Sequence, residues 1–278
     1  MPKQVDIRVY NIGRTMLNRD EVRLWLADLG VSSDAIEKLV SQDVTDCANL
    51  VRLMGKRCYM AFEGDGKLNP NVMKVRDEIA EYVDNILKSK HGSVIEHVVY
   101  NFAIEGISRV LTAELNRHRA GVAISEGSMR YIRFKDIQYW LPNSVKSDES
   151  DSPEISEKKR ITREIFENAF KQAEENYDKL ENLWSSELAP SSKFKSKKEV
   201  TSMMRRVVPI GVSTGGCWSF NFRALRHVCT MRCDQAAEEE INELAVKLLN
   251  HMMKSEIHFF NDFSQDDNGF WHPKYNKV

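Results

Sequence analysis

The longest segment with a single pattern runs from residue 153 to residue 188, and it restricts the chain to folds that can hold a long helix. It reads PEISEKKRITREIFENAFKQAEENYDKLENLWSSEL, with charged residues around an apolar stripe. Ser152 and Pro153 form a typical helix start, because serine accepts hydrogen bonds from the first free amides and proline has no amide to leave unpaired. The stripe keeps no heptad repeat, so we predict a solvated amphipathic helix rather than a coiled coil. Its apolar positions are Ile161, Ile165, Phe166, Ala169, Phe170, Ala173 and Tyr177.

Shorter patterns before this helix predict both strands and helices. Side chains alternate with period two over 5–12 and again over 96–106, which is typical of half-buried strands. Asn18 and Gly30 are the expected cap and stop of a first helix. Ser108 is the expected cap of a helix that follows the second strand directly.

Three further segments show helical spacing. A helix of about five turns is expected between Pro70 and Gly92, since proline suits a helix start and glycine a helix end. Residues 196–209 and 221–260 complete the helical part. No internal repeat and no convincing boundary divides the chain. We therefore expect a helix-rich α/β fold of the α+β kind, with a single domain over 1–278.

Composition excludes several classes of protein. Lys plus Arg number 40 and Asp plus Glu number 41, so no basic field covers the whole chain and no nucleic acid polymer is expected as a partner. No apolar run approaches the ~20 residues of a membrane span. The start of the chain alternates like a strand and does not resemble a signal peptide. Five cysteines without framework spacing suggest reduced thiols, which favours a cytoplasmic location.

One group of soft metal ligands needs weighing. His227, Cys229 and Cys233 lie within seven residues, and Cys217 is not far away. On a helix the two cysteines share a face while the histidine points elsewhere, and zinc sites usually take their ligand pairs from a turn. We favour buried thiols over a zinc site, and we predict no metal.

The stretch NRHRAGVAISEGSMRY, from Asn116 to Tyr131, crowds chemically active side chains together. Its first arginines could simply be charges at a helix end, where the macrodipole favours cations. Small residues follow, however, and then Glu126, Ser128 and Arg130, which alternation would place on one side of an extended segment. Guanidinium groups suit phosphate, and a carboxylate and a hydroxyl can bind a sugar or a base. We therefore predict a pocket for a phosphorylated polar ligand.

Two other interpretations of this stretch are weaker. Ser128 with His118 could suggest a nucleophile and its base, but no nucleophile elbow surrounds the serine and no third group orients the histidine. Walker and dinucleotide glycine motifs are also missing, so an ordinary nucleotide-binding fold is not expected.

Two blocks of sequence carry a family resemblance. HGSVIEHVVYNFAIEGISRVLTAELNRHRAGVAISEGSMRY resembles the signature region of the flavin-dependent thymidylate synthases, which have an Arg-His-Arg followed by a serine and then Arg-Tyr. RRVVPIGVSTGGCWSFNFRALRHVCTMRCDQAAEEEINELA resembles their second block, with an Asn-x-Arg, a further arginine and an Ala-x-x-Glu-Ile. The blocks cover 88–131 and 205–245 in the expected order.

The resemblance implies a fold, an assembly and a reaction. The fold is a compact α/β unit that forms a homotetramer, with active sites shared between subunits. In this chain, 1–87 would be partly an N-terminal extension. The reaction is the reductive methylation of dUMP to dTMP, with methylenetetrahydrofolate as the one-carbon donor. NADPH reduces FAD, and the cofactor carries the redox chemistry while the protein positions and polarises.

The resemblance also implies roles for individual residues. An arginine such as Arg232 against the uracil edge would stabilise developing enolate charge, and His91 lies near the reacting centre. The residues implied in holding the flavin are Cys58, Ser93, Arg117, His118, Arg119, Asn221, Arg223 and His227. The residues implied in binding the nucleotide are Glu114, Arg117, Glu126, Ser128, Arg130, Arg205 and Arg232.

The chain departs from the family pattern at four places. Eight residues rather than seven separate Arg-His-Arg from the serine, so the loop near Gly121 must bulge. Glu114 stands where a glutamine commonly holds the nucleotide phosphate, and we expect its carboxylate to turn onto Arg117 or Arg130 unless the nucleotide is not dUMP. Cys58 and His227 replace the commoner serine and asparagine.

Three alternative functions remain open at this point. The first is a related flavin-dependent methylase of another uridine nucleotide, such as UMP. The second is a non-catalytic relative that binds flavin or nucleotide. The third is a helical interaction protein that binds no flavin.

Overall fold

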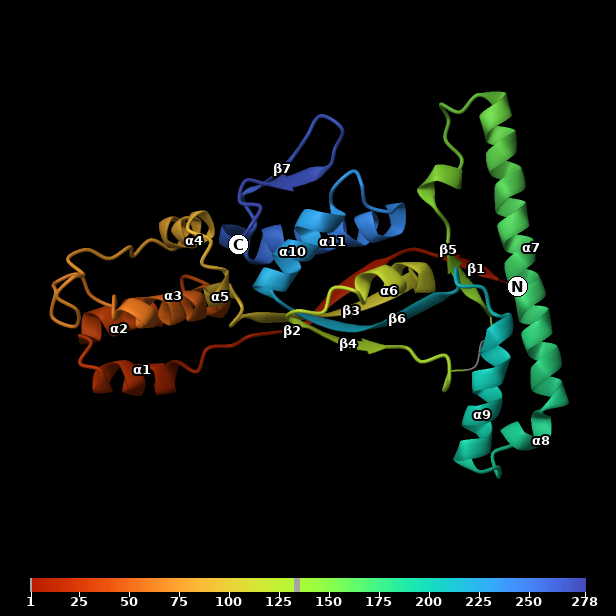
Figure 1. The fold of residues 1–278 in the computed structure, drawn as a ribbon, viewed down its shortest axis with the longest axis horizontal. Helices are drawn as coiled ribbons and strands as arrows, with labels where there is room; N and C mark the ends of the chain where they lie inside the picture. Colours follow the sequence, from red (N-terminus) through yellow and green to blue (C-terminus); the bar gives the residue numbers. More distant parts are fainter. Residues whose placement is uncertain (1, 133–135) are drawn as a thin grey trace.

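The centre of the fold is an antiparallel sheet of four strands in the order β2-β3-β6-β4, seen in the computed structural model of residues 2–132 and 136–278 (Figure 1). The strands are β2 (Arg8–Arg14), β3 (Val99–Ser108), β4 (Val122–Glu126) and β6 (Ser213–Asn221). The longest ladder joins β3 to β6, from Val99 opposite Asn221 to Ser108 opposite Ser213.

The predicted alternation in β3 is confirmed. Val98, Tyr100, Phe102 and Ile104 are all fully buried and belong to the main hydrophobic core. Strand β6, in contrast, was not predicted, because Gly215 and Gly216 interrupt its pattern of β-forming side chains. This central strand therefore has a sequence that is typical of a turn.

Helices cover one face of this sheet. They are α6 (Arg109–Leu115), α10 (Phe222–Arg232) and α11 (Glu239–Ser255), which lie above the strands in Figure 1. The last residues add η3 (Ile257–Phe259) and the hairpin of β7 (Phe263–Gln265) and β8 (Trp271–Pro273). Several large apolar side chains of the outer strands are exposed instead, namely Tyr10, Ile12 and Ile124.

Five helices form one end of the molecule. They are α1 (Arg19–Asp28), α2 (Ser33–Leu39), α3 (Asp46–Tyr59), α4 (Ile79–Lys88) and α5 (Gly92–Ile95). The predicted caps of the first helix are confirmed, because Asn18 accepts a hydrogen bond from the amide of Glu21 and Gly30 has a left-handed φ of 80°. Leu26, Ile36 and Leu53 belong to a separate hydrophobic cluster here.

The predicted helix from Pro70 to Gly92 is wrong in its first half, since α4 begins only at Ile79. Residues before it form a loop closed by local hydrogen bonds. Asn69 Oδ1 accepts from the amide of Asn71, and the amide of Val72 donates to the carbonyl of Asn69. An asparagine beside proline offers the backbone this alternative to a helix.

The other end of the molecule is dominated by α7 (Pro153–Leu183), with α8 (Ser185–Leu188) and α9 (Phe194–Met204) beside it. The predicted start is confirmed, because Ser152 Oγ accepts from the amide of Ile155. Short elements connect this end to the sheet: β1 (Lys3–Val5) pairs with β5 (Gln138–Trp140), and η1 (Asn143–Val145) and η2 (Arg205–Val207) flank the helices.

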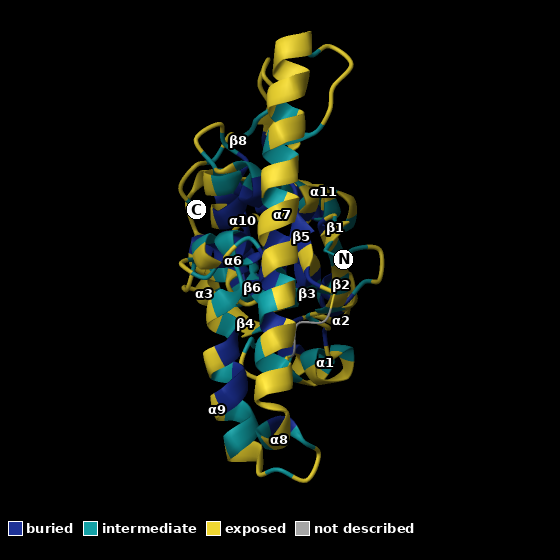
Figure 2. Ribbon diagram, turned by 90° about the vertical axis from the view of Figure 1, so that its right-hand side faces the viewer, coloured by how far each residue is buried: buried dark blue, intermediate teal, exposed yellow. Residues whose placement is uncertain are grey.

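The predicted apolar stripe of α7 is only partly buried. Phe170, Ala173 and Tyr177 are buried, whereas Ile161 and Ile165 are 43% and 61% exposed. Figure 2 shows the exposed residues along the outer side of this helix. No helix within 2–132 and 136–278 is long and apolar enough to cross a membrane.

Candidate active site

Helix α10 brings two side chains of the second block onto the Arg-His-Arg segment. Helix α6 ends at Leu115, so Arg117, His118 and Arg119 lie in the turns just after it. Arg232 Nε donates to His118 Nε2 at 3.1 Å. The rings of His118 and His227 meet edge to face, with centroids 5.7 Å apart. Residues implied for the flavin and for the nucleotide therefore lie in contact.

Glu114 pairs with Arg232. Arg232 Nη1 donates to Glu114 Oε2 at 2.9 Å, and the two side chains are 20% and 27% exposed. Our expectation that Glu114 turns onto Arg117 or Arg130 is therefore wrong about the partner, although the carboxylate is paired with an arginine. Glu114 lies in the last turn of α6 and His118 in the segment just after it, and Arg232 bonds both.

His118 is held in its neutral form. Burial, together with the charges of Arg232, His227 and Arg117, lowers the pKa of His118 from 6.5 to about 4. Its Nε2 is then free to accept the hydrogen bond that Arg232 donates. The histidine consequently orients the arginine without adding a second positive charge.

Asn221 and Gly121 form a close contact that fixes the start of α10. Asn221 Oδ1 accepts a hydrogen bond from the backbone amide of Ala224, and the backbone amide of Asn221 donates to the carbonyl of Gly121. Gly121 has the left-handed φ of 71°, and a Cβ placed there would lie 2.4 Å from Asn221 Nδ2. The predicted bulge at Gly121 is thus a turn that only glycine fits.

Arg223 and His227 line a cavity of about 300 Å³ together with the C-terminal segment 275–278. Arg223 Nε donates to the carbonyl of Val278 at 2.9 Å, and its Nη1 bonds Glu96 Oε1 at 2.5 Å. Sequence reasoning missed this segment, because nothing in its composition links it to the signature blocks.

Cys58, His91 and Ser93 line a second cavity, of about 550 Å³, between α3, α4 and α5. These three predicted residues are thus brought together. Gly92, between His91 and Ser93, packs closely against Arg223, since a Cβ on Gly92 would lie 2.8 Å from Arg223 Nε. The residues implied for the flavin therefore form neighbouring groups that meet at α5 and α10.

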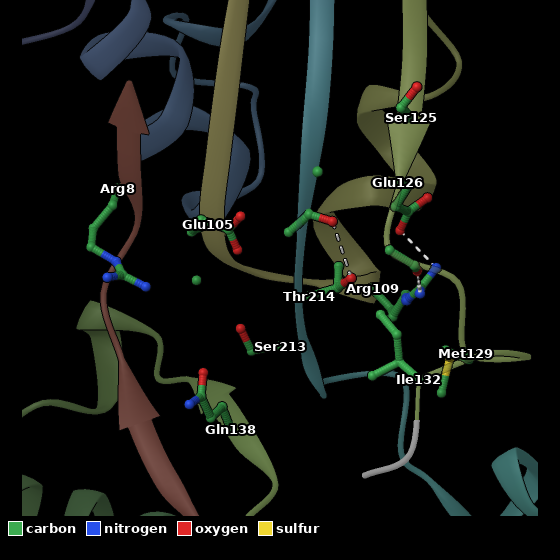
Figure 3. Close-up of a pocket in the computed structure, with 14 residues that line it drawn as sticks. Arg8, Glu105, Arg109, Ser125, Glu126, Met129, Ile132, Gln138, Ser213 and Thr214 are labelled. Atoms are coloured by element: carbon green, nitrogen blue, oxygen red, sulfur yellow. Dashed lines mark hydrogen bonds and ion pairs between the residues drawn. The ribbon is translucent and has the colours of Figure 1, made fainter. Parts of the chain in front are cut away.

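Glu126 lies in a third cavity, of about 520 Å³ (Figure 3). Its Oε1 accepts from Arg109 Nη1 at 2.7 Å, and its Oε2 accepts from Asn116 Nδ2 at 2.9 Å. Trp218 Nε1 in turn donates to Asn116 Oδ1 at 3.1 Å. Arg109 and Asn116 hold the carboxylate in place, and only the proximity of Asn116 to Arg-His-Arg could have indicated this in the sequence.

The expected alternation of Glu126, Ser128 and Arg130 is wrong. Strand β4 ends at Glu126, and the chain then turns, with the amides of Tyr131 and Ile132 donating to the carbonyl of Ser128. The amide of Arg130 donates to Ser128 Oγ at 3.3 Å. Serine and glycine offer the backbone a turn here in place of a strand.

Two further expectations concern Arg205 and the thiols. Arg205 begins η2 after α9, and it lines none of the three cavities described above. Cys229 and Cys233 are buried in the core, where their mutual hydrogen bond and then burial raise the pKa of Cys229 well above its usual value. His227 instead faces His118.

The start of α6 is clamped by Glu240, which is 2% exposed. Glu240 Oε1 accepts from the amide of Ser108 at 2.6 Å, and Oε2 accepts from its hydroxyl. Burial raises the pKa of Glu240 from 4.5 to about 7, with the charges of Glu238 and Glu243 adding to the effect and the hydrogen bonds opposing it. A carboxyl with a raised folded pKa binds its proton more tightly in the folded state.

The free energy of unfolding should therefore fall as pH rises from about 4.5 to about 7. Glu240→Gln keeps the shape and removes the titration, so we expect this part of the pH dependence, roughly 3 kcal/mol, to disappear. Urea unfolding at about pH 5 and about pH 7.5 measures it. An unchanged slope in the variant would contradict the assignment to Glu240.

Both the sequence and the fold resemble those of known proteins. A sequence model of the family described as Thymidylate synthase complementing protein matches residues 38–255. The flavin-dependent thymidylate synthase of Mycolicibacterium vanbaalenii is 32% identical over 225 residues, which are 80% of this chain and 82% of that protein. The same enzyme from Clostridium tetani is 31% identical over 180 residues, 64% of this chain and 68% of that protein.

A solved structure shares the fold. The UMP/dUMP methylase PolB from Streptomyces cacaoi, bound with 5-Br UMP, aligns with a TM-score of 0.62 at 14% identity. The alignment covers 94% of this chain and 95% of that chain. At this identity the likeness establishes the fold.

Proposed function

Because the chain belongs to the family of the flavin-dependent thymidylate synthases, we propose that it catalyses the reductive methylation of dUMP to dTMP. FAD is the proposed cofactor, NADPH the reductant and methylenetetrahydrofolate the one-carbon donor. The observation that carries the proposal is the contact between Arg232, His118 and Glu114, which joins the two signature blocks into one polar cluster.

The residues present fit a flavin. The cavity of Cys58, His91 and Ser93 combines an aromatic wall of Tyr59 and Tyr82 with polar side chains, as a ring system that must be oriented requires. Arg117 and Arg119 flank His118, whose ring meets that of His227, and they supply cations for phosphate groups. Bound FAD would supply hydride transfer to the methylene adduct of the nucleotide.

Arg232 is the proposed group that stabilises charge on the uracil. Its Nε is committed to His118 and its Nη1 to Glu114. Within the described part of the chain Nη2 has no partner, which leaves this donor for a carbonyl oxygen of the base. A fixed guanidinium against developing enolate charge makes C5 more nucleophilic without a cysteine nucleophile. His91, at the start of α5, is the second residue that we assign to the reacting centre.

The phosphate of the nucleotide is assigned to other arginines. A carboxylate at Glu114 that is already paired would repel a dianion, so we assign the phosphate to Arg117, Arg130 and Arg205. Ser128 is a ligand contact and not a nucleophile, and Glu126 is held by Arg109 for bonding to the sugar.

Glu114→Gln tests the position of this carboxylate. If Glu114 only orients Arg232, the nucleotide KM should stay within about twofold while kcat falls up to about fivefold, since a partly exposed ion pair is worth ~1 kcal/mol. Steady-state kinetics with Glu243→Gln as control measure both constants. A nucleotide KM that falls tenfold or more would instead put Glu114 at the phosphate.

We propose that the active enzyme is a homotetramer with shared sites. The supporting observation is that one chain divides six of the implied residues among three separate cavities, whereas Arg205 and the other implied residues line none of the three. Exposed Ile161 and Ile165 offer apolar surface for contacts between subunits. Light scattering on an active sample measures the mass, and a fully active monomer would refute the proposal.

We also propose a cytoplasmic location, which the free cysteines favour.

A competition assay tests the function. The purified protein is incubated with FAD, NADPH and methylenetetrahydrofolate, and dUMP and UMP are offered together while products are resolved by mass. Methylation of dUMP alone supports the proposal. Methylation mainly of UMP favours the second candidate function, a flavin-dependent methylase of UMP. We consider this candidate because a UMP/dUMP methylase shares this fold. Bound flavin without product would indicate a non-catalytic relative.

A further inference from the structure

Two exposed aromatic rings stack beside the turn that we assign to the nucleotide. Tyr131 and Phe194 are 54% and 68% exposed, yet their rings lie nearly parallel, with centroids 5.9 Å apart and 10° between their planes. Lys198 Nζ lies 5.7 Å from the centre of the Tyr131 ring. Neither ring belongs to the hydrophobic core clusters. Exposed aromatic surface of this kind is typical of a contact site for another ring.

The start of α9 adds positive charge to this pair. Lys193, Lys195, Lys197 and Lys198 occur within six residues. Lys197 is engaged, because its Nζ donates to the carbonyl of Pro190 at 2.8 Å. Lys195 is 86% exposed, and its closest acid, Glu199, is at 4.0 Å. We refer to Tyr131, Phe194, Lys193, Lys195 and Lys198 as the α9 track.

The α9 track lies beside Arg130, which we assign to the phosphate of the nucleotide. Tyr131 directly follows Arg130, and Phe194, Lys198 and Arg205 are spaced to share one face of α9 and its extension. Eleven residues of helix span roughly 16 Å. The two rings of the track thus adjoin Arg130, the lysines surround them at the start of α9, and Arg205 lies at the opposite end of the helix.

A ring followed by several negative charges fits this surface. The proposed one-carbon donor has this chemistry, because the pterin of folate is followed by a p-aminobenzoyl ring and then by a chain of γ-linked glutamates. Separate flexible ammonium groups suit carboxylates spaced along a chain, whereas phosphates are better held by arginine forks. We propose that the α9 track binds the p-aminobenzoyl ring and oligoglutamate tail of methylenetetrahydrofolate, an inference that rests on the proposed function.

The test compares methylenetetrahydrofolate that carries one glutamate with the form that carries five. With dUMP and NADPH saturating, the pentaglutamate should have a KM about tenfold lower, as expected from two or three exposed ion pairs, with kcat unchanged. The preference should fall at about 0.5 M salt, which screens exposed charges. Lys195→Gln/Lys198→Gln should reduce it to within about twofold. The matched control Lys171→Gln/Lys179→Gln, on exposed positions of α7, should keep it.

The aromatic pair is tested with the monoglutamate. Phe194→Ala should raise the KM for this folate, and Phe194→Tyr, which keeps the ring, should restore it. A KM that is equal for Ala and Tyr variants and for the unchanged protein would remove the rings from the folate site.

The remaining outcomes separate this inference from the function that it rests on. Equal KM values for the two folates overturn the inference and leave the methylation intact. If the lysine variant changes only the KM for NADPH, measured as flavin reduction without folate, the track binds the reductant and the inference is wrong. If neither folate gives product, the proposed function fails. In that case calorimetric titration of both folates into the flavin-loaded protein tests the inference separately. Tighter binding of the pentaglutamate supports it, and equal or absent binding overturns it.

Discussion

Replacing Arg232 with alanine is expected to lower kcat for dUMP methylation by roughly a hundred- to a thousandfold, the effect of removing one preorganised donor to a developing oxyanion. The reason is geometric, since His118 and Glu114 hold two edges of the guanidinium and leave the third for the substrate. Single-turnover kinetics with reduced enzyme measure the chemical step directly.

Two controls make this result specific. Arg206→Ala removes an exposed arginine near Arg205 and should leave kcat unchanged, so a loss in both variants would indicate a nonspecific charge effect. The flavin absorbance of Arg232→Ala should also be retained. If kcat falls less than about tenfold, Arg232 is not the group that stabilises the uracil in the transition state.

Asp262→Asn is expected to lower the free energy of unfolding by about 3–5 kcal/mol, because it leaves a buried guanidinium without its counter-charge. Arg226 and Asp262 are only 3% and 5% exposed and form two parallel bonds of 2.7 and 2.9 Å. Asp262 also accepts from the amide of Tyr275 at 3.2 Å. Urea unfolding measures this loss of stability. We also expect the variant to bind flavin more weakly, since the C-terminal segment 275–278 holds Arg223 through the carbonyl of Val278.

An exposed ion pair provides the matched control. Arg23 and Glu37 bond at 2.8 Å at the surface, so Glu37→Gln should not change the urea midpoint measurably. If both variants shift the midpoint equally, burial is not what makes the Arg226 pair important. If the Asp262→Asn protein is as stable as the unchanged protein but binds flavin weakly, the Arg226–Asp262 pair positions the C-terminal segment and does not stabilise the fold.

Local signals in the sequence predicted local structure well. Asn18, Ser108 and Ser152 were identified as helix caps, and each accepts the expected amide. The alternation in β3 gave its buried face. These features depend on hydrogen bonds and spacings within a few residues, which a sequence displays directly.

Features set by distant parts of the chain could not be predicted in this way. Glu114 finds Arg232 across 118 residues, so its nearest arginines in sequence were the wrong choice. Strand β6 is specified by its place between β3 and β4 rather than by its own residues, two of which are glycines. The family resemblance indicated the site residues, but only the fold shows which of them touch.

The order of strands has a consequence for how the protein is made. Strand β4, which ends at Glu126, is an edge strand whose ladder partner is β6, with Val122 opposite Phe220. During synthesis β4 therefore leaves the ribosome with the signature segment attached and waits unpaired until the second block emerges. Both clamps of α6, at Glu240 and at Arg232, arrive with that same block. A nascent chain that stalls before β6 thus exposes β4 as an unpaired strand and lacks the contacts of Arg232 with His118 and Glu114, so this interval of translation is the one in which the open edge is most exposed to aggregation.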